Sequence, residues 1–434
     1  MRADNRVAIV GLGYVGLPLA LSFVEAGFQV VGVDASAQRV AELCAGRSPI
    51  DDIDDARLRR GLEAGLGVVA TEDADLAAVD AIFVCVPTPI TEAKDPDLGP
   101  MISAAGLVGR TLRAGQLIVL QSTTFPGTTM GPFRDELERS GFKAGIDFDL
   151  AFAPERVSPG DPASASVAIP RLVGGATPAG TARAAALLRH INTTVYELSS
   201  PDTAELAKLL ENVFRNVNIA LVNQLALLCE RMGLDVWEVI DAAATKPFGF
   251  MPFRPGPGVG GHCIPVDPYY LSWRARQFDF ADRFVELAGD INLSMPRHVV
   301  DPVAEALNDR GKPLKGARVT ILGVAFKPDV RDPRNSPASE IIAVLRRRGA
   351  MVMFHDPHVD RFRDQDGGEH DSLPLSAALD RVDIAVIVTP HAAIDWDAVF
   401  EGAELVVDTT NRSRDRIVRH RQVLRLGAGW SAAS

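Results

Sequence analysis

The feature that most constrains the fold is a glycine-rich turn between a strand and a helix near the N-terminus. Residues 6–10 (RVAIV) are a short apolar run, GLGYVG follows at 11–16, a helical pattern runs to residue 26, and a second apolar run at 29–33 ends on Asp34. Strand, G-x-G-x-x-G, helix, strand and acid in this order are typical of a parallel βαβ unit that binds a dinucleotide. The alternative is a glycine-rich turn in some other α/β unit.

Each position of this motif has a physical role. Gly11 permits the tight turn, Gly13 lets a pyrophosphate approach the helix N-terminus, and Gly16 lets helix and strand pack closely. Asp34 is placed to accept hydrogen bonds from the adenosine ribose, and its charge would repel a 2′-phosphate, so NAD is favoured over NADP. The cofactor-binding residues predicted in this part of the chain are Gly11, Gly13, Tyr14, Val15, Gly16, Asp34, Arg39, Pro87 and Thr88.

Three more apolar runs, at 79–86, 117–120 and 148–153, predict further strands of the same sheet. The first is apolar apart from Asp80 near its start, as strands buried on both faces are. Polar segments follow each run, and open parallel sheets bind ligands outside the carboxyl ends of their strands. Glu155, which follows the third run, is therefore a candidate site residue, with a plain surface carboxylate as the alternative.

Residues 202–232 predict one long helix with Asp202 as its N-cap. About thirty residues at about 1.5 Å each make it roughly 45 Å long, enough to connect two domains. Apolar residues cover most of its circumference, so we expect other helices or a second subunit to bury it. Lys208 and Asn212 stand four apart on one face, but surface polar pairs are common on helices, so spacing alone does not assign them to catalysis.

The C-terminal third repeats the N-terminal pattern: residues 25–34 are echoed by 348–356, and 79–87 (VDAIFVCVP) by 382–390 (VDIAVIVTP). The sequence therefore predicts an α/β fold with two Rossmann-like doubly wound domains joined by a central helical domain with one long helix. The predicted bounds are 1–198, 199–300 and 301–434. Basic residues replace the glycine triplet in the second copy (VAFKPDVRDPR), which suits a different phosphorylated ligand unless this loop is simply solvated.

The stretch from 247 to 270, PFGFMPFRPGPGVGGHCIPVDPYY, leads through closely spaced glycines to Cys263. Glycines let backbone N–H groups approach a ligand, and the flanking prolines stiffen the chain. A rigid cradle around one thiol predicts a nucleophile, and a stiff surface loop with an incidental cysteine is the alternative. His262 is interpreted as a neighbour and not as the base, because adjacent residues of an extended chain point to opposite sides.

Composition limits the partners and the compartment. The net charge is −11 and the pI is near 5.3, which argues against a nucleic-acid surface. Four cysteines in 434 residues do not make a disulfide framework and fit a reducing cytoplasm. We find no signal-peptide pattern and no apolar run near the ~18 residues of a membrane span, so we expect a soluble intracellular protein.

Seven motifs occur in one order: GLGYVG at 11, VPTP at 86, STTFPG at 122, APE at 153, ELAKLLEN at 205, GPGVGGHCIPVDP at 256 and GVAFKPDVRDPR at 323. In this order the chain resembles the UDP-glucose/GDP-mannose 6-dehydrogenase family across nearly its whole length. The stretch around Cys263 looks most like the branch that oxidises UDP-N-acetylhexosamines, especially UDP-N-acetylglucosamine. The resemblance implies oxidation of the C6 alcohol of a UDP-sugar to a carboxylate with two NAD⁺ and no metal, for surface polysaccharide precursors, by a homodimer or higher homo-oligomer.

The resemblance also implies residue roles. Cys263 would add to the intermediate aldehyde as a thiohemiacetal, which is oxidised to a thioester and hydrolysed. Lys208 and Asn212 would stabilise the developing alkoxide, and Asp267 would activate water or take the proton. Thr123 and Glu155 match residues that position water. Thr123 and Arg334 are further implied cofactor contacts, with Arg334 reaching from the second domain; the implied substrate contacts are Glu155, Arg156, Lys208, Asn212, Arg254 (from a partner subunit), Gly258, Gly260, Gly261, Lys327 and Arg412.

Several alternatives stay open at this point. The same chemistry could act on UDP-N-acetylmannosamine, UDP-glucose or a UDP-galactosamine-type sugar. A two-electron alcohol dehydrogenase would need no covalent step at Cys263. A protein that senses nucleotides without reducing NAD⁺ would be no enzyme at all.

Overall fold

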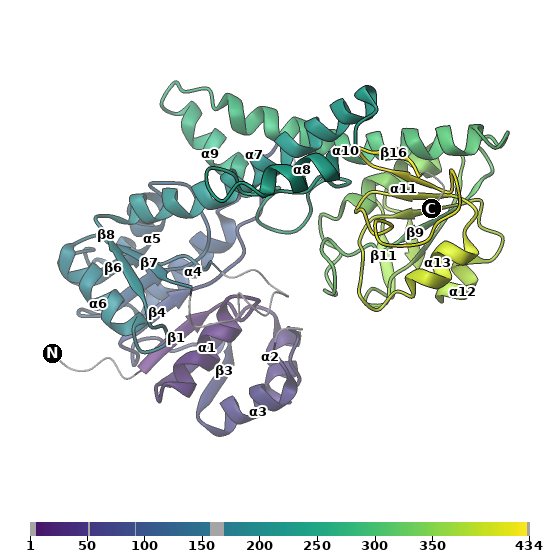
Figure 1. The fold of residues 1–434 in the computed structure, drawn as a ribbon. Coiled ribbons are helices and arrows are strands. Elements are labelled where there is room, and N and C mark those ends of the chain that lie inside the picture. The colour runs from purple at the N-terminus through teal and green to yellow at the C-terminus, as the bar shows by residue number, and fades with distance from the viewer. Residues whose placement is uncertain (1–5, 51–52, 92, 157–168, 432–434) are drawn as a thin grey trace. The chain divides into compact units, whose positions relative to one another are not determined.

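The computed structural model describes residues 6–50, 53–91, 93–156 and 169–431, and it confirms the predicted α/β fold (Figure 1). The chain divides into two compact units, Met1–Glu211 with Tyr269–Ala281, and Asn212–Pro268 with Asp282–Ser434. Each unit is built on one main sheet. The predicted three-part division at 198 and 300 stays a prediction.

The main sheet of the first unit has the strand order β3-β2-β1-β4-β5-β6-β7-β8. All neighbours in it are parallel except β6 and β7. The strand predicted at 79–86 is shorter at both ends, since β4 covers only Ala81–Val84. On its C-terminal side the chain leaves the ladder ahead of Pro87, which has no N–H to donate. The strands are β1 (Arg6–Val10), β2 (Gln29–Asp34), β3 (Leu66–Ala70), β4 (Ala81–Val84), β5 (Leu117–Leu120), β6 (Asp149–Phe152), β7 (Arg171–Gly175) and β8 (Val195–Leu198).

Helices cover both faces of this sheet, as the alternation of side chains along β1 shows. Val7 and Ile9 belong to a cluster that includes apolar side chains of α1, α3 and α6, whereas Ala8 and Val10 belong to a cluster with α4 and α5. The unit is therefore doubly wound. The helices are α1 (Gly16–Glu25), α2 (Ala37–Cys44), α3 (Asp55–Glu63), α4 (Gly99–Thr111), α5 (Arg134–Leu137) and α6 (Pro178–Leu188).

The long helix is present as α7 (Pro201–Met232) and spans 32 residues. It begins one residue before the predicted start, and Asp202 lies in its first turn instead of capping it. Ser200 supplies the cap, because its hydroxyl accepts the Thr203 N–H at 3.2 Å, and a proline suits the first turn, where its missing N–H has no partner to lose. The helices that follow α7 before the second main sheet begins are α8 (Val236–Ala244), α9 (Asp267–Arg276) and α10 (Arg283–Asn308).

The main sheet of the second unit has the order β10-β9-β13-β14-β15-β16. Its first three strands are parallel and repeat the arrangement β2-β1-β4, so the internal repeat read from the sequence is a repeat of topology. The strands are β9 (Arg318–Leu322), β10 (Met351–His355), β13 (Ile384–Ile387), β14 (Val406–Asp408), β15 (Val423–Arg425) and β16 (Gly429–Trp430), beside a hairpin of β11 (Arg361–Arg363) and β12 (Glu369–Asp371). Its helices are α11 (Pro337–Arg347), α12 (Leu375–Leu379) and α13 (Trp396–Gly402).

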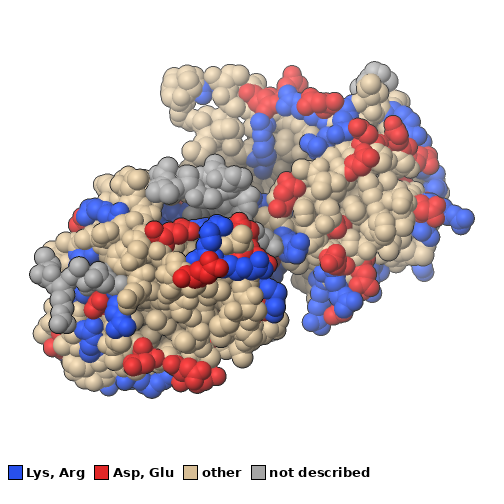
Figure 2. All heavy atoms as spheres, turned by 90° about the horizontal axis from the view of Figure 1, so that it is seen from below, with Lys and Arg blue, Asp and Glu red and all other residues tan. Residues whose placement is uncertain are grey.

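The surface carries charges of both signs. Acidic and basic side chains are interspersed on the face drawn in Figure 2. Within the described ranges, no helix is both long enough and apolar enough to cross a membrane.

Candidate active site

The glycine fingerprint adopts the geometry that a dinucleotide requires. Gly11 has φ +94°, and a Cβ there would lie 2.6 Å from the Cys85 carbonyl oxygen; a Cβ on Gly16 would lie 1.8 Å from the Gly11 oxygen. At Gly13, by contrast, a Cβ would meet no atom within 4 Å. The first and third glycines are therefore required by the fold, and the second leaves open space just ahead of the N-terminus of α1, where an anionic pyrophosphate fits.

Asp34, the last residue of β2, is held beside this turn. One carboxylate oxygen accepts the Leu12 N–H at 2.9 Å and lies 3.3 Å from the Arg39 guanidinium; the other accepts the Ser36 N–H at 2.9 Å. A carboxylate offers about four acceptor positions, so one remains for a ribose hydroxyl. These residues fit NAD, and Tyr14 and Val15 pack the turn against the core.

The predicted residues after β4 and β5 lie at the same edge of the sheet, because β1, β4 and β5 are consecutive parallel strands. The hydroxyl of Ser122 donates to the Val86 carbonyl at 2.8 Å and ties the two strand ends together. The carbonyl of Thr88 accepts the hydroxyl of Tyr270 on α9. Pro87, Thr88 and Thr123 thus follow strands that end at the same edge of the sheet as β1, which leads into the glycine turn. Their contact with the cofactor stays a prediction.

Glu155 follows β6 and is neither exposed nor isolated. Its side chain is 13% exposed and accepts the Arg171 guanidinium at 2.6 Å and the Arg156 N–H at 2.8 Å. Arg156 in turn pairs with Glu211 of α7 at 2.5 Å. The plain surface carboxylate is therefore excluded. Sequence reasoning missed Arg171, an arginine at a strand start that carries no local signal.

Glu205 on α7 is a second residue that sequence reasoning missed. Its buried carboxylate accepts the Gly127 N–H at 2.7 Å, the Thr129 N–H at 2.8 Å and the Thr129 hydroxyl at 2.6 Å. Burial raises the pKa of Glu205 to about 7, although these bonds favour the ionised form. The feature of the sequence that could have indicated Glu205 is its position three residues before Lys208, on the same face of the helix. Glu205 ties the loop that carries Thr123 to the helix that carries Lys208.

Lys208 and Asn212 are one turn apart on α7, and both are buried, with 7% and 5% of their surface exposed. A buried lysine is uncommon and distinguishes this pair from the solvated polar pairs of a helix surface. The Asn212 amide donates to the carboxylate of Asp267, the first residue of α9, which is only 3% exposed.

Cys263 lies one helical turn ahead of α9. Its carbonyl accepts the N–H groups of Val266 at 3.0 Å and Asp267 at 2.8 Å, and its side chain is exposed. The thiol therefore belongs to the N-terminal end of a helix, which favours negative charge. Cys85 and Cys229, by contrast, are buried among apolar residues.

The glycines ahead of Cys263 pack closely against the protein itself. A Cβ on Gly260 would lie 2.9 Å from the Asn335 carbonyl oxygen, and one on Gly261 would lie 2.9 Å from the Phe326 ring. Gly258 has φ +134°, a backbone conformation that L side chains rarely adopt. Packing at Gly260 and Gly261 and backbone conformation at Gly258 thus account for the glycines, and the predicted contact of their N–H groups with the sugar stays a prediction.

The basic loop after β9 faces this glycine loop. Arg334 bonds the carboxylate of Asp332 through its backbone N–H at 3.0 Å, Nε at 2.9 Å and Nη2 at 2.8 Å. Lys327 is partly buried in the same loop. Two other predicted substrate residues make different local contacts, since Arg254 pairs with Asp241 and the Arg412 guanidinium lies 5.5 Å from the centre of the Trp396 ring.

One histidine-rich cluster in the second unit resembles a metal site. The ligand atoms of Asp329, His358 and His391 lie within 4.8 Å of one another. However, both ring nitrogens of His391 are already used: Nδ1 accepts the Asp329 N–H at 2.9 Å and Nε2 donates to Asp356 at 3.0 Å. The absence of a metal from the reaction stays a prediction.

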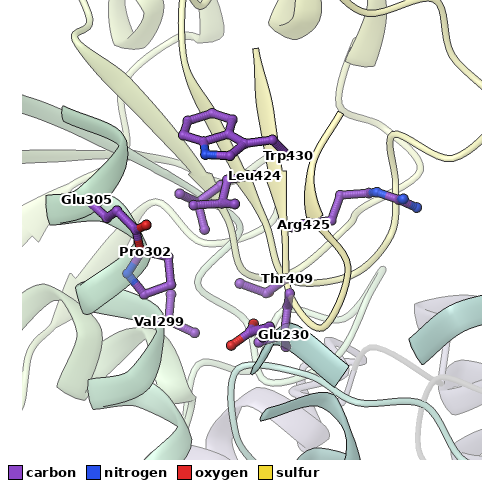
Figure 3. Close-up of a pocket in the computed structure, with 11 residues that line it drawn as sticks. Glu230, Val299, Pro302, Glu305, Thr409, Leu424, Arg425 and Trp430 are labelled. Atoms are coloured by element: carbon purple, nitrogen blue, oxygen red, sulfur yellow. The ribbon is translucent and has the colours of Figure 1, made fainter. Parts of the chain in front are cut away.

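A pocket of about 190 Å³ also lies in the second unit, lined by the end of α7, by α10, and by β14, β15 and β16 with their connecting loops (Figure 3). In the close-up Trp430 lies over Leu424, and Glu230 is at the opposite end. The Glu230 carboxylate accepts the Gly427 N–H at 2.9 Å and pairs with His298 at 2.9 Å, and Arg425 pairs with Asp235 at 2.7 Å. Two of its charged groups, Glu230 and Arg425, thus have protein partners, and none of the predicted site residues lines it.

Comparison with known proteins gives one consistent result along the chain. Models of the UDP-glucose/GDP-mannose dehydrogenase family match as the NAD binding domain at 5–192, the central domain at 202–294 and the UDP binding domain at 320–414.

Two curated relatives match most of the chain. A UDP-N-acetyl-D-glucosamine 6-dehydrogenase from Pseudomonas aeruginosa is 38% identical over 82% of this chain and 83% of its own. A UDP-N-acetyl-D-mannosamine dehydrogenase from Pyrococcus horikoshii is 35% identical over 94% and 95%. The solved structure of a UDP-D-ManNAc dehydrogenase from Pyrococcus horikoshii has a TM-score of 0.89 at 32% identity and covers 98% of this chain and 99% of its own.

Proposed function

The chain belongs to the UDP-glucose/GDP-mannose dehydrogenase family, and from this membership we propose that it oxidises the C6 alcohol of a UDP-N-acetylhexosamine to the carboxylate. It is an NAD-dependent oxidoreductase of nucleotide sugars. UDP-N-acetylglucosamine is our first candidate substrate, in line with the relative at 38% identity. UDP-N-acetylmannosamine is the second, supported by the relative and the structure that cover more of the chain.

The observation that carries the mechanism is the position of Cys263 one turn ahead of α9, whose first residue is bonded to Asn212. When bound, NAD⁺ accepts the hydride of each oxidation. The Cys263 thiolate adds to the carbon of the first-formed aldehyde and gives a thiohemiacetal. Loss of a second hydride from that carbon gives a thioester, and water then breaks the carbon–sulfur bond, releasing the carboxylate and the thiol.

The surrounding residues keep the roles that the family resemblance implies, and their contacts are compatible with them. The buried ammonium of Lys208 and the amide of Asn212 stabilise the negative charge that develops on the C6 oxygen. Asp267, already held by Asn212, accepts a proton from the hydrolytic water. Glu155 and Thr123 position that water, with Glu155 held in place by its bond to Arg171.

The substrate contacts keep their predicted assignment. Lys327 and Arg254 are expected to bind the phosphates and sugar, with Arg254 supplied by a second copy of the chain. A stripe of exposed apolar residues along one face of α7 supports a homodimer, since contiguous exposed apolar surface marks protein–protein contacts. The stripe consists of Leu206, Leu210, Phe214, Leu221 and Leu228. A cytoplasmic location, where thiols stay reduced, completes the proposal.

One turnover experiment tests the proposal. The wild type should form two NADH per UDP-sugar consumed, and kcat/KM across UDP-N-acetylglucosamine, UDP-N-acetylmannosamine and UDP-glucose should rank the substrates. Cys263→Ser should lower turnover to the acid by on the order of 10³-fold or more. Cys44→Ser is the matched control, because Cys44 is also exposed and lies outside the site. One NADH per sugar with free aldehyde as product, or full turnover by Cys263→Ser, would refute the covalent mechanism.

A further inference from the structure

The loop that carries Cys263 is held against the basic loop after β9 by contacts from three consecutive residues. The carbonyl of Gly261 accepts the side-chain amide of Asn335 at 3.0 Å. Gly260 and Gly261 both lie against Phe326, closely enough that a Cβ on either would come within 2.9 Å of it. The third contact is made by His262, which immediately precedes the thiol.

The imidazole of His262 is bonded to Asp332. Its Nε2 lies 2.6 Å from the Asp332 carboxylate, and its ring packs edge-on against the Phe326 ring at a centroid distance of 6.0 Å. Burial alone would raise the pKa of Asp332, but hydrogen bonds from His262 and Arg334 outweigh it and hold the pKa well below its usual range. The carboxylate is therefore ionised and can only accept, so Nε2 carries the proton and donates it.

This bond acts on the neighbouring thiol through the backbone. His262 and Cys263 share a peptide bond, so fixing the imidazole leaves few dihedral angles through which Cys263 can move. On the other side, the Cys263 carbonyl is fixed by the N–H groups of Val266 and Asp267. Building on the proposed function, we propose that His262 and Asp332 are positioning residues that hold Cys263 in the orientation needed to capture the aldehyde.

The consequence concerns the fate of the intermediate. A thiol that samples several orientations captures the aldehyde more slowly, and misplacement by about 1 Å can cost on the order of 100-fold in rate. The first oxidation does not involve the thiol and is expected to continue. Loss of the pair should therefore release aldehyde, while binding of the UDP-sugar stays nearly intact.

Three variants of the full-length enzyme test this inference. His262→Leu keeps the bulk but removes the donor, His262→Gln places an amide N–H near the position of Nε2, and His298→Leu removes a comparable histidine–carboxylate pair (His298–Glu230, 2.9 Å) elsewhere in the same unit. NADH formed per sugar, aldehyde trapped with a hydrazine, and separate kcat and KM values are measured with the best UDP-sugar.

We expect His262→Leu to lower kcat for acid formation about 10- to 100-fold with the UDP-sugar KM within about 3-fold of wild type. Its NADH yield should fall from two toward one per sugar, with trapped aldehyde making up the difference. His262→Gln should regain most of the loss, and His298→Leu should behave as wild type. Two NADH per sugar and unchanged kcat in His262→Leu would overturn the inference.

Two further comparisons keep the test decisive. If His262→Leu does not fold, His262→Gln is compared with His262→Asn, whose shorter amide cannot reach Asp332; equal aldehyde release by the two would overturn the inference. Cys263→Ser distinguishes failure of this inference from failure of the proposed function. If Cys263→Ser still makes the acid, the covalent mechanism itself is refuted. If Cys263→Ser is inactive but His262→Leu behaves as wild type, only the positioning role of His262 and Asp332 is refuted.

Discussion

Replacing Gly260 with alanine probes how tightly the cysteine loop is seated. An ideal Cβ at this position would lie 2.9 Å from the Asn335 carbonyl oxygen, 2.9 Å from Cβ of Phe326 and 3.2 Å from Cδ of Pro337. Two of these contacts are shorter than real Cβ atoms show, and one is with backbone, so a side-chain rotation cannot relieve the clash. Either the cysteine loop or the loop after β9 must move.

The size of the effect follows from the cost of overpacking, about 1–3 kcal/mol. For a folding unit of 150–250 residues, each kcal/mol lowers Tm by about 2–4 °C, so Gly260→Ala should lower Tm by roughly 2–12 °C. Because Cys263 lies only three residues further on, turnover to the acid should fall more than binding of the UDP-sugar. Thermal unfolding by circular dichroism and steady-state NADH formation measure the two effects.

Gly256→Ala is the matched control in the same loop. A Cβ on Gly256 would meet no atom within 4 Å, and its φ is not positive. Alanine there should be neutral or stabilise by up to about 1 kcal/mol, because it restricts the unfolded chain. If Gly260→Ala matched wild type in both Tm and turnover, as Gly256→Ala is expected to, the inference that the two loops are closely packed would be wrong.

Three other substitutions extend the test to the rest of the site. Asp34→Ala should raise the KM for NAD⁺ about 10-fold and increase kcat/KM with NADP⁺ relative to NAD⁺, because the charge that repels a 2′-phosphate is gone while Arg39 remains; an unchanged cofactor ratio in steady-state assays would contradict this. Because the pKa of Glu205 is raised to about 7 from 4.5, its contribution to stability is fully present below about pH 4.5 and is lost as pH rises through 7, by up to roughly 3 kcal/mol. Urea unfolding at several pH values should show this fall in the free energy of unfolding with rising pH in wild type and not in Glu205→Gln. An equal dependence on pH in the two proteins would refute the raised pKa of Glu205. Asn223→Ala should cost about 2–4 kcal/mol, because it leaves the Gly256 N–H and the side-chain Oδ1 of Asn292 without their partner, whereas Asn218→Ala on the same helix should cost less than 1 kcal/mol in the same measurement.

The parts of the fold that the sequence predicted are those encoded by local patterns. The glycine turn, the long helix and the internal repeat each depend on residues close together in the chain, where a period or a spacing is visible. The start of α7 was wrong by one residue, because Ser200 and Asp202 both carry a capping oxygen and only the backbone geometry decides between them.

The contacts that organise the site could not be predicted in this way. Glu205 reaches Thr129 across 76 residues, and His262 reaches Asp332 across 70. From the sequence, any acid in the chain could have been the partner of Thr129 or of His262, and no periodicity selects among the acids. Arg171 is similar, because its role depends entirely on β6 and β7 being antiparallel neighbours.

The two copies of the βαβ pattern show why a repeated fold need not repeat a site. Asp356 comes directly after β10, as Asp34 comes at the end of β2. Asp34 accepts the N–H of Leu12, which follows Gly11, and Asp356 accepts the N–H of Val324, which follows Gly323. Asp34 accepts bonds from two N–H groups and one guanidinium, whereas Asp356 accepts five, from four backbone N–H groups (Val324, Ala325, His358 and Val359) and from Nε2 of His391.

Five donors exceed the roughly four acceptor positions of a carboxylate, so Asp356 has none left for a ribose. The histidine that completes the set comes from the loop after β13, the counterpart of the loop after β4 that contains Thr88 in the first copy. The same acid that can bind a nucleotide in the first sheet therefore serves in the second to fix the loop after β9. That loop carries Phe326, Asp332 and Asn335, the three residues against which the cysteine loop is held.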